Sequence, residues 1–62
     1  MLDYFKLILS KVSFDRRLFE KELLKAIKSL IPTELKELRK WCYAKFGDIY
    51  KPILNKCFLI SN

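Results

Sequence analysis

Histidine is absent from this 62-residue sequence, and glycine occurs only once. Without histidine, the chain lacks the usual general base near neutral pH and the usual partner of serine and cysteine nucleophiles. The single glycine, Gly47, cannot form the glycine-rich loop that surrounds phosphate groups. The acidic residues stand mostly at expected helix starts or close to lysines and arginines, so no carboxylate pair is set apart for acid–base chemistry. The sequence therefore predicts a protein that is not an enzyme, has no cofactor and takes no small-molecule substrate.

Cysteine is also scarce, and its spacing carries no redox or zinc motif. Cys42 and Cys57 are fifteen positions apart, so neither belongs to a C-x-x-C pair. Two thiolates are half of a structural zinc site, which would need a dimer or added carboxylates to become complete. Free cysteine usually behaves as a small buried hydrophobe. We expect both thiols in the core and no metal site, with a disulfide or a reactive thiol as the alternative.

Long apolar runs are missing. None exceeds four residues, whereas a membrane-spanning helix needs roughly 18. The beginning of the sequence is interrupted by Asp3, Lys6 and Lys11, so it lacks the apolar centre of a signal peptide. We therefore expect no membrane span and a cytoplasmic location.

Apolar residues are nevertheless abundant, at 52% of the chain, with only two prolines to interrupt them. This composition favours a single folded domain over residues 1–62. A chain of this length buries only about 60% of its unfolded surface, so some apolar side chains should stay exposed and form a contact surface. A homodimer is the simplest way to cover that surface. The candidate interface residues are Leu7, Phe58, Leu59 and Ile60.

Apolar residues recur every three or four positions along the whole chain, which is typical of amphipathic helices. The predicted fold is all-α, a compact bundle of four short helices at about 2–12, 15–30, 34–46 and 49–60. Asp15 is the expected N-cap of the second helix, because its carboxylate can accept hydrogen bonds from free amides of the first turn. Pro32 should end that helix, and Thr33 is the expected cap of the third.

A tight Gly-Asp turn is expected between the third and fourth helices. Gly47 can take the left-handed conformation that ends many helices, and Asp48 would then cap the next helix. Ile49 and Tyr50 would open the apolar face of that helix. Pro52 lies late in its first turn, which predicts an irregular or displaced start.

The net charge is +6, from 13 basic and 7 acidic residues, and it is spread evenly along the chain. Basic residues gather on one side of the second and third predicted helices. Lysine and arginine side chains make the phosphate contacts in many nucleic-acid-binding proteins. This side could equally be a solvated face that keeps the protein soluble. The candidate anion or nucleic-acid contacts are Arg17, Lys21, Lys25, Lys28, Lys36, Arg39, Lys40 and Tyr43.

A helix-turn-helix formed by the last two predicted helices is a weaker hypothesis. Its reading helix would begin Asp-Ile-Tyr-Lys-Pro, which lacks side chains suited to reading base edges. Separately, the run L-x-x-L-R-x-W-C-Y-x-x-x-G-x-x-Y, from Leu35 to Tyr50, resembles the effector-associated, death-fold-like adaptor domains of bacteria. The resemblance covers a quarter of the chain and does not establish membership. It implies an adaptor role.

Together these patterns predict a small, non-enzymatic helical module for protein–protein interaction, expected to be a homodimeric regulator or adaptor. The alternative is a small basic nucleic-acid-binding protein that uses the second and third helices. A third hypothesis is a subunit of an enzyme whose active site another chain completes. The partner is expected to be a second copy of the chain or another protein.

Overall fold

The computed structural model describes residues 1–60, which form three helices and no strand. They are α1 (Leu2–Lys11), α2 (Arg16–Ser29) and α3 (Pro32–Ile60). The predicted all-α class is confirmed, whereas the predicted count of four helices is wrong. The residues expected to form the third and fourth helices belong to one long helix with a kink.

The first two helices are separated by a short loop whose ends are well defined by hydrogen bonds. The amide of Val12 donates to the Ile8 carbonyl at 3.0 Å and closes α1. Asp15 caps α2 as expected, since its carboxylate accepts from the amides of Arg17 at 2.9 Å and Leu18 at 3.2 Å. The loop therefore satisfies backbone groups that a helix end leaves free.

The link between α2 and α3 is shorter than the sequence suggests. Leu30 adopts an extended conformation after α2, and Pro32 is already the first residue of α3. Proline suits that position because it has no amide hydrogen to leave unsatisfied and its fixed φ is helical. Pro32 thus separates the helices as predicted, but Thr33 lies inside α3, so its predicted role as the cap is wrong.

The turn predicted at Gly47 and Asp48 does not exist. Gly47 does not have a positive φ, and the helix continues through both residues. The departure from helical geometry lies at Tyr50, with φ −120° and ψ 23°. Pro52 explains this position, because a proline inside a helix cannot donate to the carbonyl four residues earlier and its ring collides with that carbonyl.

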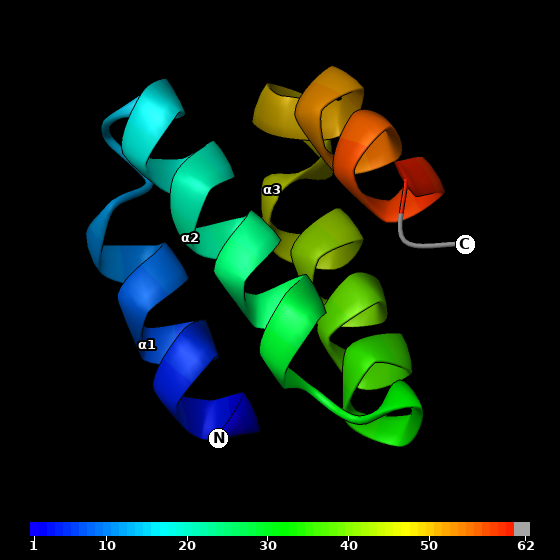
Figure 1. The fold of residues 1–62 in the computed structure, drawn as a ribbon. Helices are drawn as coiled ribbons and strands as arrows, with labels where there is room; N and C mark the ends of the chain where they lie inside the picture. The colour runs from blue at the N-terminus through cyan, green and yellow to red at the C-terminus, as the bar shows by residue number, and fades with distance from the viewer. Residues whose placement is uncertain (61–62) are drawn as a thin grey trace.

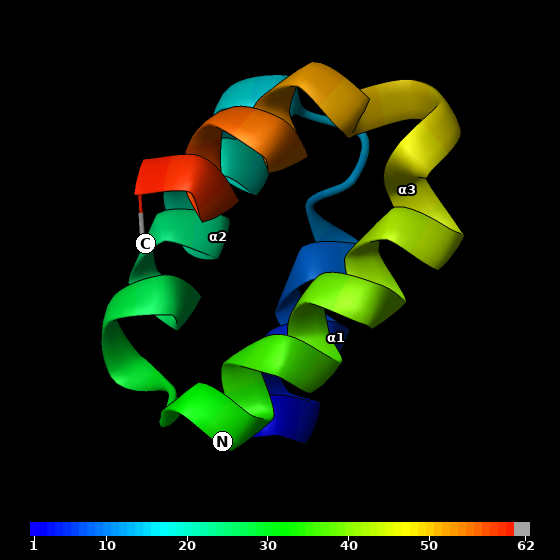
Figure 2. The same cartoon turned by 90° about the vertical axis from the view of Figure 1, so that its right-hand side faces the viewer.

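The kink divides α3 into an N-terminal arm, residues 32–49, and a C-terminal arm, residues 51–60. Figure 1 shows α1 and α2 side by side, with α3 folded back along them. Figure 2 shows the two arms of α3 meeting at an angle, so that the C-terminal arm crosses towards α2. Lys56 of this arm forms an ion pair with Glu20 of α2 at 3.1 Å.

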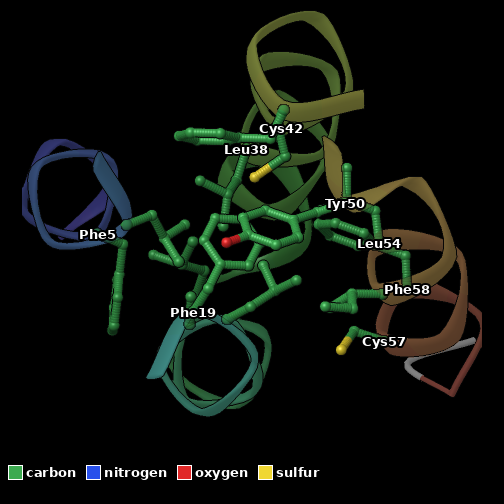
Figure 3. Close-up of a cluster of buried hydrophobic side chains, with 14 residues drawn as sticks. Phe5, Phe19, Leu38, Cys42, Tyr50, Leu54, Cys57 and Phe58 are labelled. Carbon is green, nitrogen blue, oxygen red and sulfur yellow. The ribbon is translucent and has the colours of Figure 1, made fainter. Parts of the chain in front are cut away.

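The core lies between these segments, and Phe19 is at its centre with no exposed surface. Its ring stacks on Tyr50 with centroids 4.6 Å apart and meets Phe46 edge to face at 5.0 Å. Figure 3 shows α2 and the N-terminal arm on opposite sides of this cluster, with α1 and the C-terminal arm on the other two sides. The buried residues are Phe5, Leu9, Phe19, Leu23, Ala26, Leu30, Leu38, Cys42, Phe46, Tyr50, Ile53, Leu54, Cys57 and Phe58.

Candidate interaction surfaces

Both cysteines are free and buried, as the sequence predicts. Burial raises the pKa of the Cys42 thiol to about 12. Burial also raises the pKa of Cys57, and the negative charge of Glu20 adds to this, while Lys56 opposes it. Thiols with raised pKa values carry little thiolate at neutral pH and are poor nucleophiles. Within residues 1–60, no three side chains of the metal-binding types come together.

The residues predicted to form a dimer interface do not gather on one surface. Leu7 of α1 and Leu59 of the C-terminal arm are exposed, by 54% and 73%. Their helix segments lie on opposite sides of the core (Figure 3). Phe58 is only 5% exposed, so it belongs to the core of this fold and offers little surface to a partner. The side chain of Ile60 lies outside the part of the structure that is described.

Two strongly exposed apolar residues, missed as interface candidates, lie at one end of the molecule. Phe14, in the loop between α1 and α2, is 80% exposed, and Ile49, next to the kink, is 68% exposed. The expectation that Ile49 opens a buried apolar face is wrong, because Ile49 is exposed and the helix bends at Tyr50 and not at Gly47 and Asp48. We call the loop of residues 12–15 together with residues 49–53 the loop–kink end (Figures 1 and 2).

A shallow hollow of about 210 Å³ opens at the loop–kink end. The hydroxyl of Tyr50 donates to the Ser13 carbonyl at 2.5 Å and ties the kink to the loop. The residues lining the hollow are Arg16, Ile49, Tyr50, Pro52 and Ile53. The sequence indicates the loop, because Ser13, Phe14 and Asp15 interrupt the helical pattern, but it does not indicate the strong exposure of Phe14.

The basic residues predicted on α2 form an exposed stripe. Arg17, Lys21, Lys25 and Lys28 are all on the surface. Lys25 pairs with Glu22 at 3.3 Å, the spacing of neighbours on a helix. Exposed pairs of this kind contribute little to stability.

The second predicted cluster lies on the N-terminal arm of α3. Lys36, Arg39 and Lys40 are exposed, and Tyr43 is half-buried. The guanidinium of Arg39 lies 5.9 Å from the centre of the Tyr43 ring, within range of a cation–π contact. The Tyr43 hydroxyl donates to the Oδ1 atom of Asn55 on the C-terminal arm. Tyr43 is therefore engaged on its ring face and at its hydroxyl.

A second shallow hollow of about 210 Å³ lies between the two arms of α3, and we call it the inter-arm groove. Its lining residues are Arg39, Tyr43, Asn55, Phe58 and Leu59. The groove thus combines a cation and an amide with an apolar wall. The sequence could not indicate it, because the residues from the two arms meet only where α3 bends.

The two basic clusters belong to different segments of the fold. Figure 3 shows these segments, α2 and the N-terminal arm of α3, on opposite sides of the core.

Comparisons with known protein families, with curated proteins and with solved structures found no match. No helix in residues 1–60 is long and apolar enough to cross a membrane. The function is therefore argued from the surfaces alone.

Proposed function

We propose that this protein is a non-catalytic module for protein–protein interaction, a small regulator or adaptor that associates with itself as a homodimer. The observation that carries this proposal is the exposure of large apolar side chains around a closed core. Among the side chains that the structure describes, eight of this kind stay substantially exposed: Met1, Tyr4, Leu7, Phe14, Leu18, Ile31, Ile49 and Leu59. Where exposed apolar side chains lie together on a small protein, they usually mark a contact site.

The loop–kink end is the surface that best suits self-association. Phe14 and Ile49 come from different elements, yet the hydrogen bond from Tyr50 to Ser13 holds those elements together. A preorganised surface loses little conformational freedom on binding. The adjoining hollow also offers a place for an apolar side chain of the second copy.

Sedimentation velocity over a range of concentrations tests this proposal. We expect the wild-type chain to sediment as a dimer at high micromolar concentration and Phe14→Ser/Ile49→Ser as a monomer, because the variant removes two exposed apolar anchors. Leu7→Ser is the matched control, since Leu7 is similarly exposed but lies on α1, and it should remain a dimer. A monomeric wild-type chain would overturn self-association. A dimer disrupted only by Leu7→Ser would place the interface on α1.

A second candidate function, nucleic-acid binding, is supported by the exposed basic stripe of α2. Such binding should weaken steeply as salt is raised, because it releases counterions. Lys21→Glu/Lys25→Glu should then abolish retention on heparin, while Lys36→Glu/Lys40→Glu on the N-terminal arm, which changes the charge equally, should not. Tyr43 is poorly placed to stack on a base, because Arg39 lies over its ring and its hydroxyl is bonded to Asn55.

A further inference from the structure

One edge of the inter-arm groove carries Arg39, which has two further basic residues, Lys36 and Lys40, close to it in the N-terminal arm. Within residues 1–60, the two ion pairs are Lys25–Glu22 and Lys56–Glu20. Lys36, Arg39 and Lys40 belong to neither pair, and all three are exposed. Arg39 and Lys40 follow Lys36 by three and four residues, so each is a neighbour of Lys36 on the surface of the N-terminal arm, and Arg39 lies at the edge of the groove.

The polar side of the groove carries two hydrogen-bond donors, Arg39 and Asn55. Arg39 is held over the Tyr43 ring, and a guanidinium can donate two parallel hydrogen bonds to one carboxylate. Asn55 accepts from the Tyr43 hydroxyl through Oδ1, so its Nδ2 is the end of the amide left to donate. Both groups suit a carboxylate, because an ionised carboxylate accepts hydrogen bonds and donates none.

The other side of the groove is apolar. Phe58 forms part of the wall, and Leu59 is 73% exposed at its rim. An aliphatic side chain of a ligand would cover Leu59 and remove apolar surface from water, which is favourable. The groove therefore fits a ligand that carries a carboxylate and an apolar group within a few ångströms of each other.

The extent of the positive charge identifies the kind of ligand. A single small carboxylate would use Arg39 and leave Lys36 and Lys40 without a role. A helix that alternates glutamates with apolar residues would place several carboxylates along the N-terminal arm and an apolar side chain in the groove. The net charge of +6 would also speed the approach of an acidic partner.

We propose that the inter-arm groove binds an acidic amphipathic helix of a partner protein, with carboxylates contacting Lys36, Arg39 and Asn55 and an apolar side chain packing on Leu59. This inference rests on the proposed function and names a surface and a partner class for it. It is independent of the self-association surface, which lies at the loop–kink end. The groove proposal and the self-association proposal can therefore succeed or fail separately.

Fluorescence anisotropy with a capped helical peptide of glutamate and leucine tests the proposal on the full chain. The wild-type chain should bind this peptide and should bind a glutamine and leucine counterpart at least tenfold more weakly. Arg39→Gln and Leu59→Ser should each weaken binding about tenfold, the loss typical of a residue central to an interface. Lys21→Gln on α2 removes the same charge elsewhere and should leave the affinity within about twofold.

The location of binding is read from the amide resonances of labelled protein during the same titration. The side-chain amide of Asn55 and the backbone of Tyr43 should shift, while the amides of α2 should not. Equal weakening by Arg39→Gln and Lys21→Gln would overturn the proposal, because it would show charge attraction without a site. Tighter binding of a single-stranded oligonucleotide, also lost in Arg39→Gln, would overturn it in favour of nucleic acid. If the peptide fails to bind but the wild-type chain still dimerises, the groove proposal falls and the proposed function stands.

Discussion

The hydroxyl of Tyr50 donates to the main-chain carbonyl of Ser13 at 2.5 Å, joining two residues that are 37 positions apart. The same ring stacks on Phe19 in the core. Tyr50 is also the residue at which α3 leaves helical geometry. One side chain therefore links the kink of α3, the centre of the core and the loop between α1 and α2.

Removing this hydroxyl should weaken the fold without disturbing the ring stacking. We expect Tyr50→Phe to lower the free energy of unfolding by about 1 kcal/mol, the usual net contribution of one hydrogen bond. Urea denaturation followed by circular dichroism measures this loss. Tyr4→Phe is the control, because Tyr4 is 55% exposed, and it should change stability little. Equal effects of the two substitutions would contradict a stabilising role for the Tyr50–Ser13 bond.

Substitution of Gly47 tests whether α3 is a continuous helix at this residue or has a glycine turn there. A Cβ atom added at Gly47 would meet nothing within 4 Å, and the residue does not have a positive φ. Gly47→Ala should therefore raise the free energy of unfolding by about 0.5–1 kcal/mol, since alanine favours the helix and restricts the unfolded chain. Ala44→Gly, at an exposed position of the same arm, should lower it by a similar amount. Destabilisation by Gly47→Ala would instead indicate a left-handed turn at this residue.

The two aspartates near expected helix starts should differ in their effect on stability. Asp15 accepts two amide hydrogen bonds at the start of α2, so Asp15→Ala should cost about 1 kcal/mol. Asp48 is exposed and lies inside α3, so Asp48→Ala should change stability by less than about 0.5 kcal/mol. Thermal or urea unfolding of the two variants checks this difference. A larger loss for Asp48→Ala would show that a helix starts there after all.

The Cys42 thiol should resist modification in the folded protein. It is fully buried and its pKa is raised to about 12, so little thiolate is present and reagents cannot reach it. Labelling with a disulfide reagent near neutral pH should be slow until denaturant is added. Ala44→Cys, an exposed position two residues away, provides the control and should be labelled rapidly. Rapid labelling of Cys42 in native wild-type protein would contradict its burial.

The same pKa shift makes stability depend on alkaline pH. The unfolded chain releases the Cys42 proton near its ordinary pKa of 9.0, whereas the folded chain holds it up to about 12. The free energy of unfolding should therefore fall as the pH rises above 9, and this thiol should have no effect well below that value. Cys42→Ala should be less stable at neutral pH, because it loses buried volume, but its stability should fall less steeply above pH 9. If the free energy of unfolding fell with pH in parallel for the wild-type protein and Cys42→Ala, the Cys42 thiol would make no contribution to the pH dependence.

Features that depend on neighbours in the sequence were predictable. Asp15 caps α2 because its carboxylate needs only the amides two and three residues ahead. Pro32 separates α2 from α3 because its effect on the preceding residue is local. The burial of Cys42 and Cys57 follows from their place in the apolar pattern of a helix, which repeats whatever the helix packs against.

Pro52 correctly indicated an irregularity in the helix, but the position of the kink was not predictable, because two local rules competed. Gly47 and Asp48 favour a turn, whereas Pro52 favours a bend a few residues later. Stacking of Tyr50 on Phe19 and its bond to Ser13 are available only when the bend lies at Tyr50. These contacts come from distant parts of the chain, so periodicity along the sequence does not contain them.

The sequence by itself determined that the protein is helical, where α2 begins and which side of each helix is apolar, because hydrogen bonds and side-chain spacing within a helix are local. Only the tertiary structure decided the bend of α3. That bend brings Arg39 beside Asn55 and Leu59 in the inter-arm groove, and Ile49, next to the bend, is strongly exposed. These surfaces depend on the direction of a helix after the kink, and that direction is set by packing against Phe19 and Ser13 from the other end of the chain.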